Sequence, residues 1–130
     1  MTKEIKKIAV IGASNNPAKY GNVIVRDLLA KGYEVVPVNP AQQEIEGLAV
    51  IHRIEDLPTD TDLLVFVVPS AVGINMAKAA VAAGFERLWF QPGAESEEII
   101  DFLESSKESI KSSARRCIMQ TSQKQGDLHF

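Results

Sequence analysis

Continuous apolar runs of strand length alternate along this chain with segments of helical periodicity. The apolar runs cover residues 8–11, 35–38, 63–68 and 88–90, with a weaker one at 117–119. A run without polar alternation predicts a strand that is covered on both faces, as in a parallel sheet. Apolar residues at helical spacing predict helices over residues 18–31, 71–83 and 95–105.

The ends of these segments agree with the predicted elements. Gly32 and Gly84 follow the first two helical segments, and glycine is preferred just after a helix. Acidic residues begin the third helical segment, where their charge interacts favourably with the helix dipole. Residues 41–58 are less periodic; we expect a short strand near 49–51 and a turn at 54–57.

The alternation of strands and helices predicts the fold class. It indicates an α/β chain with one Rossmann-like, doubly wound domain and a mostly parallel sheet of five or six strands. We assign residues 1–121 to this domain. The polar residues 122–130 are expected to form a flexible C-terminal tail.

The length and net charge of the chain limit the kinds of partner that the protein is expected to bind. The chain has 130 residues, of which 45% are hydrophobic and 24% charged, which suits one globular domain. Its formal net charge of -3 provides no overall field that would attract nucleic acid or anionic lipid. A phosphorylated ligand would therefore need a local site.

No segment has the pattern of a membrane span or a signal peptide. No apolar run approaches 18 residues, and polar residues soon interrupt the apolar stretch that follows the basic N-terminal residues. We therefore expect a cytoplasmic protein without a membrane or nucleic-acid partner.

The cysteine and histidine content argues against a metal site and a disulfide framework. Cys117 is the single cysteine, and His52 and His129 are the two histidines. His52 has no paired nucleophile or carboxylate pattern, so we assign no catalytic residue. We interpret Cys117 as a small core residue, although the neighbouring Arg115 and Arg116 favour a reactive thiol as the alternative.

Candidate ligand-binding residues follow the predicted strands. In doubly wound folds, ligands bind beyond the carboxyl ends of the strands. The segments at those positions are residues 12–21, 39–40, 69–70 and 91–93. We expect all four to converge on one edge of the sheet.

The first of these segments has the make-up of a phosphate-binding loop. Gly12, Ala13 and Ser14 connect the first strand to the first helix, where free backbone amides can accept an anion. The spacing matches neither G-x-G-x-x-G nor the nucleotide-triphosphate P-loop. A plain strand-to-helix turn, with Ser14 as a cap and Pro17 near the helix start, remains the alternative.

The other segments permit both a binding and a purely structural interpretation. Asn39–Pro40 ends the second strand where a dinucleotide-dependent dehydrogenase would carry an acidic residue, which argues against NAD. From the residues alone, Pro69 and Gln91–Gly93 are interpreted first as ordinary turns, with Gly93 able to supply a positive φ. Their exposed backbone groups would also suit a ligand groove.

Taken together, the motifs resemble the CoA-binding domain family. The resemblance runs in family order over about residues 5–120 and is carried by residues 8–14, 16–17, 33–40, 44–47, 62–69, 89–93 and 116–118. The chain is similar to small stand-alone members, and to the N-terminal domains of the succinyl-CoA synthetase α subunit and of ADP-forming acyl-CoA synthetases.

The resemblance implies a Rossmann-like fold and CoA or acyl-CoA as the ligand. It places phosphate groups at Gly12–Ser14, adenosine beside Asn39 and Pro40, and the pantetheine end near Gln91–Gly93. From its position at the first helix, Lys19 is a cationic partner for phosphate. The residues that we assign to cofactor binding are Gly12, Ala13, Ser14, Asn16, Pro17, Lys19, Tyr20, Asn39, Pro40, Val68, Pro69, Ser70, Gln91, Pro92 and Gly93.

The chain departs from the family pattern in one place. Many relatives carry a lysine or arginine shortly after the Asn-Pro turn, and this chain has Ala41, Gln42 and Gln43. No histidine lies in a motif matching that of the larger synthetases, so we expect no acyl-CoA synthetase activity from this chain alone. Our preferred hypothesis is a CoA or acyl-CoA binding module that has no catalytic activity alone and acts as carrier, sensor or partner subunit. The alternatives are a binder of NAD or ATP and a thiol-redox protein that uses Cys117 with CoA.

Overall fold

The computed structural model describes residues 4–110, 112–114 and 118–121. Its strands are β1 (Lys7–Ile11), β2 (Glu34–Val38), β3 (Glu44–Ile45), β4 (Leu48–Ala49), β5 (Leu63–Phe66), β6 (Arg87–Phe90) and β7 (Ser112–Ala114). Its helices are α1 (Tyr20–Ala30), α2 (Ser70–Ala82), α3 (Glu97–Ser105), α4 (Ile118–Thr121) and the 3-10 turn η1 (Ile54–Asp56). Cys117 and the predicted tail at 122–130 lie outside the described residues.

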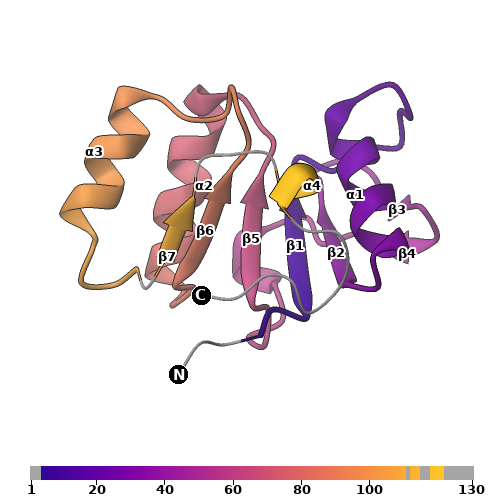
Figure 1. Ribbon diagram of the computed structural model, residues 1–130, viewed down its shortest axis with the longest axis horizontal. Helices are drawn as coiled ribbons and strands as arrows, with labels where there is room; N and C mark the ends of the chain where they lie inside the picture. The colour runs from indigo at the N-terminus through magenta and orange to yellow at the C-terminus, as the bar shows by residue number, and fades with distance from the viewer. Residues whose placement is uncertain (1–3, 111, 115–117, 122–130) are drawn as a thin grey trace.

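Five strands form one parallel sheet in the order β2-β1-β5-β6-β7 (Figure 1). β1 is central, with Ile8 opposite Val35 on one side and Leu63 on the other. Beyond β2, Ile51 forms a single parallel bridge with Val38, and its N–H donates to the Pro37 carbonyl at 2.9 Å. With Ile51 counted as a reduced third strand, the order is the doubly wound 3-2-1-4-5-6 arrangement, so the predicted fold is confirmed.

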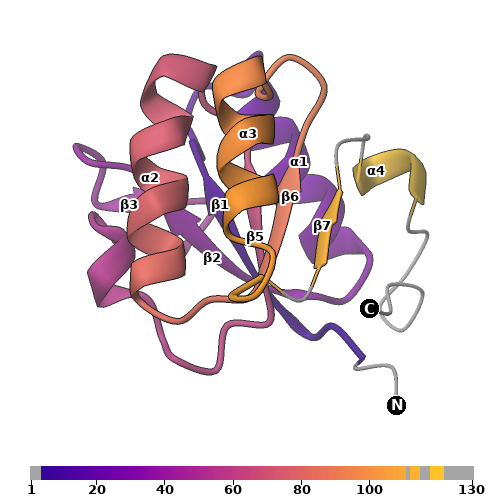
Figure 2. The same ribbon diagram turned by 90° about the vertical axis from the view of Figure 1, so that its left-hand side faces the viewer.

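Helices cover both faces of the sheet (Figure 2). On one face, α1 and α4 contribute Ile24, Leu28 and Ile118 to a cluster that includes the fully buried Trp89. On the other face, α2 and α3 pack over Phe66 and Phe90, whose rings stack with centroids 4.6 Å apart. This double cover explains why the central strands carry no polar alternation.

The predicted helices are present, with ends that differ by one or two residues. The first begins at Tyr20 instead of Ala18, because residues 16–19 form a turn. In that turn the Asn16 side-chain oxygen accepts the Ala18 N–H at 3.0 Å, and its carbonyl accepts the Lys19 N–H at 3.0 Å. The run at 63–68 is a strand only as far as Phe66, and Val67 and Val68 continue beyond the sheet.

The prediction of a final strand at 117–119 is wrong. Ile118 and Met119 belong to α4, where Ile118 is fully buried and the Lys31 ammonium donates to the Met119 carbonyl at 2.8 Å. The strand that pairs with β6 is instead β7, with Ser112 opposite Arg87. Backbone hydrogen bonds build an edge strand whatever its side chains are, so the polar sequence of β7 carried no strand signal.

Candidate functional site

The four predicted ligand-binding segments all lie at the carboxyl edge of the sheet. Residues 12–19 follow β1, Asn39–Pro40 follow β2, residues 67–69 follow β5, and Gln91–Gly93 follow β6. Ser70 begins α2 directly after Pro69. The parallel sheet therefore brings these segments to one side of the molecule, as predicted (Figure 1).

A cavity of about 520 Å³ opens between the ends of β5 and β6. Its lining is mainly apolar and combines predicted with unpredicted residues: Tyr20, Val67, Val68, Pro69, Gln91, Pro92, Gly93 and Ala94. Val67 and Ala94 were not predicted, because the first reads as strand and the second as a plain loop residue. A cavity of this size and character suits an elongated organic ligand.

Gly12 joins the β1 loop to the wall of this cavity. Its φ of +100° is in the region that favours glycine, and its N–H donates to the Val38 carbonyl at 3.1 Å. A Cβ atom at position 12 would lie 2.8 Å from Val68 Cγ1. The loop therefore passes in direct contact with a residue that lines the cavity.

Backbone amides at the β1–α1 junction are left without hydrogen bonds. Within the part of the chain that the structure describes, the N–H groups of Ala13, Ser14, Tyr20 and Gly21 have no acceptor. Unpaired amides at a helix start, together with the positive end of the helix dipole, favour an anion. Tyr20 also lines the cavity, so the amides and the cavity form one continuous site.

Two asparagine side chains hold the carbonyl groups of the loop. Asn39 Nδ2 donates to the Ala13 carbonyl at 2.9 Å, and Asn22 Nδ2 donates to the Ser14 carbonyl at 2.8 Å. Asn39 Oδ1 also accepts the N–H groups of Ala41 and Gln42. The polar atoms of Asn39 thus hold both the loop after β1 and the turn after β2. The predicted contact between Asn39 and adenosine stays a prediction.

The predicted polar residues of the loop have distinct surroundings. Ser14 Oγ is largely buried and accepts the Asn16 N–H at 3.0 Å. The Pro17 carbonyl accepts from Arg26 Nη2 at 3.2 Å. Lys19 is exposed and precedes α1, and its ammonium has no hydrogen bond or ion pair within the described residues. The Lys19 ammonium is therefore free of partners among the described residues, and its contact with a ligand phosphate stays a prediction.

The turn after β2 contributes groups that the sequence did not reveal. Gln42 Oε1 accepts the Asn15 N–H at 2.9 Å, and His52 Nε2 donates to the Gln42 carbonyl at 3.0 Å. Asn15 Nδ2 donates to the Glu44 carbonyl at 2.7 Å.

Asn22 had a signal in the sequence, since it shares a helix face with the apolar Val25. Gln42 had none, because its role depends on a tertiary contact.

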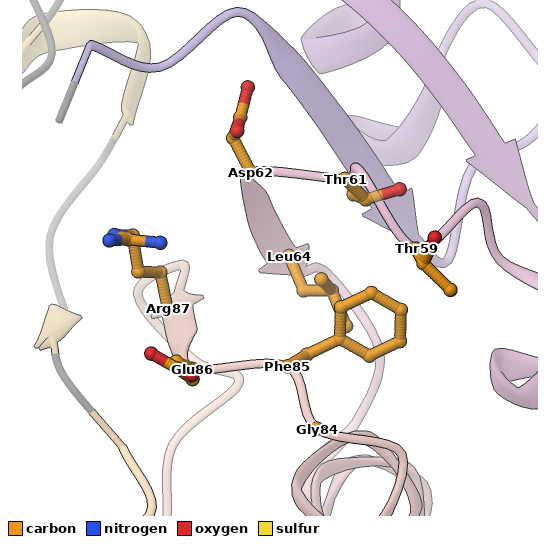
Figure 3. A pocket seen from close by; sticks show the side chains of 8 residues that line it. All are labelled: Thr59, Thr61, Asp62, Leu64, Gly84, Phe85, Glu86 and Arg87. Atoms are coloured by element: carbon orange, nitrogen blue, oxygen red, sulfur yellow. The ribbon is translucent and has the colours of Figure 1, made fainter.

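A second concave region lies at the opposite, amino edge of the sheet (Figure 3). It has a volume of about 310 Å³ and is lined by Thr59, Thr61, Asp62, Leu64, Gly84, Phe85, Glu86 and Arg87. None of the predicted site residues is among them. Arg87 Nε is buried there without a hydrogen-bond partner in the described residues.

The described residues hold neither a metal-binding cluster nor a bilayer-spanning helix. No cluster of three or more His, Cys, Asp or Glu side chains suits a metal ion there. No described helix combines the length and apolar character that crossing a bilayer requires.

Comparison with known proteins identifies the family. The family model described as "CoA binding domain" matches residues 6–123. The chain belongs to the CoA-binding domain family. The fold and the family that the sequence motifs predicted are both confirmed.

The curated relatives of this CoA-binding domain include much larger proteins. The alpha subunit of the ADP-forming acetate–CoA ligase II of Pyrococcus furiosus is 40% identical over 63 residues, which cover 48% of this chain and 14% of that subunit. The chain spans only a small fraction of such ligases. An uncharacterized protein of Bacillus subtilis, YneT, is 24% identical over 105 residues and is covered to 78% of its length.

Solved structures show the same pattern of small and large relatives. A conserved hypothetical protein from Pyrococcus furiosus is 58% identical with a TM-score of 0.86; the match covers 91% of this chain and all of that one (100%). A dinucleotide-forming acetyl-coenzyme A synthetase of Candidatus Korarchaeum cryptofilum is 28% identical with a TM-score of 0.68. That match covers 82% of this chain and 25% of the synthetase.

Proposed function

We propose that this protein is a CoA or acyl-CoA binding module that has no catalytic activity of its own. The observation that carries this proposal is the continuity between unpaired amides and an apolar cavity. The N–H groups of Ala13, Ser14, Tyr20 and Gly21 suit a diphosphate, and the adjoining cavity suits an uncharged organic arm. CoA combines these two chemistries in one molecule, and membership of the family supports it as the ligand.

In the proposed arrangement, each part of CoA has a matching surface. The diphosphate takes the free amides, with the ammonium group of Lys19 as a charge partner. The pantetheine arm follows the cavity past Val68, Pro69 and Pro92. Adenosine lies towards Asn39 and Pro40. The turn after β2 has no cation between residues 39 and 46 and carries Glu44 and Glu46, so a cation for the 3′-phosphate would have to come from outside this turn.

The proposal assigns catalysis to other proteins. Within the described part of the site, Asn22, Asn39 and Gln42 hold the protein's own backbone, and no nucleophile–base pair faces the cavity. The ligases that share this domain are several times longer than the matching region. We propose that the module delivers or senses CoA, alone or beside a partner subunit.

A ligand panel tests the proposal directly. The unfolding midpoint is measured with CoA, dephospho-CoA, NAD and ATP, each at millimolar concentration, followed by calorimetric titration. A ligand at about 100 times its Kd adds roughly 2.7 kcal/mol to the stability of the folded state, which raises the midpoint of a domain of this size by several degrees. CoA is expected to give the largest shift.

The other outcomes of the panel are equally decisive. A shift with NAD or ATP and none with CoA would keep the fold and overturn the proposed ligand. A larger shift with CoA than with dephospho-CoA would show that a cation meets the 3′-phosphate despite Ala41–Gln43. A separate test uses added CoA disulfide: attack by the Cys117 thiolate would form a mixed disulfide and release one CoA thiol, and this product, if abolished in Cys117→Ser, would support the thiol-redox alternative.

A further inference from the structure

The Ser14–Asn15 peptide is held from both sides by side chains. Its carbonyl oxygen accepts from Asn22 Nδ2 at 2.8 Å, and its N–H donates to Gln42 Oε1 at 2.9 Å. In a planar trans peptide the C=O and N–H bonds point in opposite directions. Asn22, by fixing the carbonyl, therefore also sets the direction of the Asn15 N–H.

The orientation of Asn22 is itself determined. Arg26 Nε, which can only donate, lies 2.6 Å from Asn22 Oδ1, so the amide NH₂ must face Ser14. Arg26 Nη2 also donates to the Pro17 carbonyl at 3.2 Å, and Asn22 Nδ2 lies 3.2 Å from Glu46 Oε2. Asn22 is fully buried. This network ties the loop, α1 and the β3–β4 hairpin together.

The preceding peptide, Ala13–Ser14, is also fixed by an asparagine side chain, but its N–H has no acceptor among the described residues. Asn39 holds the Ala13 carbonyl at 2.9 Å, which sets the direction of the Ser14 N–H, and that N–H is unpaired. The next N–H along the chain, that of Asn15, is instead occupied by the neutral amide oxygen of Gln42. The directions of two successive N–H groups are thus fixed by asparagine side chains, and one of these groups is already occupied.

We propose that Asn22 is a positioning residue for the phosphate of a ligand. We propose also that Gln42 competes with this phosphate for the Asn15 N–H. Gln42 Oε1 occupies the Asn15 N–H until a phosphate oxygen replaces it. A charged phosphate oxygen is a stronger acceptor than a neutral amide oxygen, so the exchange is favourable once the ligand is present. This inference rests on the proposed function, since it assigns a phosphate-bearing ligand to the same loop.

The two residues are expected to affect affinity in opposite directions. Gln42→Ala removes the competitor and leaves the Asn15 N–H free, so the affinity should rise about three- to tenfold, the worth of one hydrogen bond. Asn22→Leu keeps the volume and adds no charge but releases the Ser14 carbonyl, so the affinity should fall about tenfold. A purely structural role for both residues would lower affinity in both variants.

The experiment uses the full chain with CoA and, separately, with inorganic pyrophosphate. Kd is measured by calorimetry for the wild type, Gln42→Ala and Asn22→Leu. Gln43→Ala and Asn75→Ala are matched controls, because both side chains are exposed and neither forms a hydrogen bond within the described residues. The ¹⁵N–¹H resonance of Asn15 is followed during each titration, and it should move when the ligand replaces Gln42.

Each outcome decides the inference. Tighter binding by Gln42→Ala, together with unchanged controls and a shifted Asn15 resonance, supports it. Binding by Gln42→Ala that is no tighter than wild type overturns it, as does wild-type affinity in Asn22→Leu. If Asn22→Leu does not fold, Gln42→Ala and the Asn15 resonance decide alone. If pyrophosphate binds more tightly to Gln42→Ala and more weakly to Asn22→Leu while CoA does not bind, the proposed function is overturned and this inference stands. Binding of neither probe overturns both.

Discussion

Gly21, in the first turn of α1, packs directly against the backbone of Gly12. A Cβ atom on Gly21 would overlap the Gly12 carbonyl oxygen and would stand 3.2 Å from Ala13 Cα. The absence of a side chain at position 21 therefore brings the helix start against the loop that follows β1. This close approach places the free amides of Ala13 and Gly21 in one small region of the molecule.

Gly21→Ala is expected to destabilise the protein by about 1–3 kcal/mol, because the helix must move away from the loop. Chemical denaturation measures this loss. Gly73→Ala is the matched control, since Gly73 is also buried in a helix but its added Cβ would meet Val68 Cγ2 at an ordinary 3.4 Å. That control should be neutral or more stable, by up to about 1 kcal/mol of helix propensity. Equal losses in both variants would contradict the close-approach explanation.

Lys19→Ala is expected to weaken CoA binding and to reduce its dependence on salt. The Lys19 ammonium is exposed and has no partner among the described residues, so it is free to meet the ligand's negative charge. Calorimetric titration at low and high ionic strength measures both effects. Lys78→Ala, which removes an exposed lysine from α2, should change neither. An unchanged affinity in Lys19→Ala would remove this residue from the site.

The stem of Arg87 is expected to contribute packing, whereas its Nε contributes no hydrogen bond within the described residues. Its Nε is buried without a partner in the described residues, which carries a penalty of about 1–3 kcal/mol. Arg87→Met keeps the aliphatic stem and removes that donor, so its unfolding free energy should match or exceed that of wild type. Arg87→Ala also removes the stem and should be less stable. A marked loss in Arg87→Met would show that the guanidinium is satisfied after all.

Lys7, at the amino end of β1, forms ion pairs with Glu34 of β2 and with Asp60 in the loop before β5, and these make part of the protein's stability dependent on pH. Its ammonium lies 2.8 Å from Asp60 and 3.3 Å from Glu34, and the hydrogen bond to Asp60 is the main cause that raises the pKa of Lys7. A raised pKa in the folded state means that the stabilisation is fully present below the ordinary value of 10.5 and is lost as the pH rises through the folded value.

The measurement compares wild type and Lys7→Met across pH. Wild type should be the more stable near neutral pH, and the difference should close as Lys7 loses its proton in strongly alkaline solution. High salt should reduce it, because the carboxylates are exposed. A difference that persists unchanged after Lys7 has lost its proton would mean that packing of the side chain, and not its charge, is responsible.

The sequence predicted most of the fold because the central elements are strongly patterned. The apolar strands at Ile8, Val35, Leu64 and Leu88 are buried on both faces, and this leaves a clear signal in the residue types. β7 was missed because an edge strand of polar residues is built from backbone hydrogen bonds alone.

The sequence predicted where the candidate site lies, but it did not predict the side-chain contacts that shape the site. Parallel strands bring their carboxyl ends together whatever the loops contain, so the convergence of Gly12, Asn39, Pro69 and Gln91 followed from topology. The contacts of Asn22, Asn15 and Gln42 depend on how the loop, helix and hairpin pack in three dimensions. No spacing in the sequence encodes such contacts.

The central position of β1 has a consequence for how the protein forms during synthesis. The β1 loop meets the cavity wall only where β1 pairs with β5, and Ile8 and Leu63 lie far apart along the chain. A nascent chain that has released β1, α1 and β2 carries the loop amides but lacks Val68 and Gln91, so it cannot hold an extended ligand. Pairing between distant strands is a slow event in folding. A ligand of the proposed site would accordingly bind after folding is complete and would not act as a template for unfinished chains.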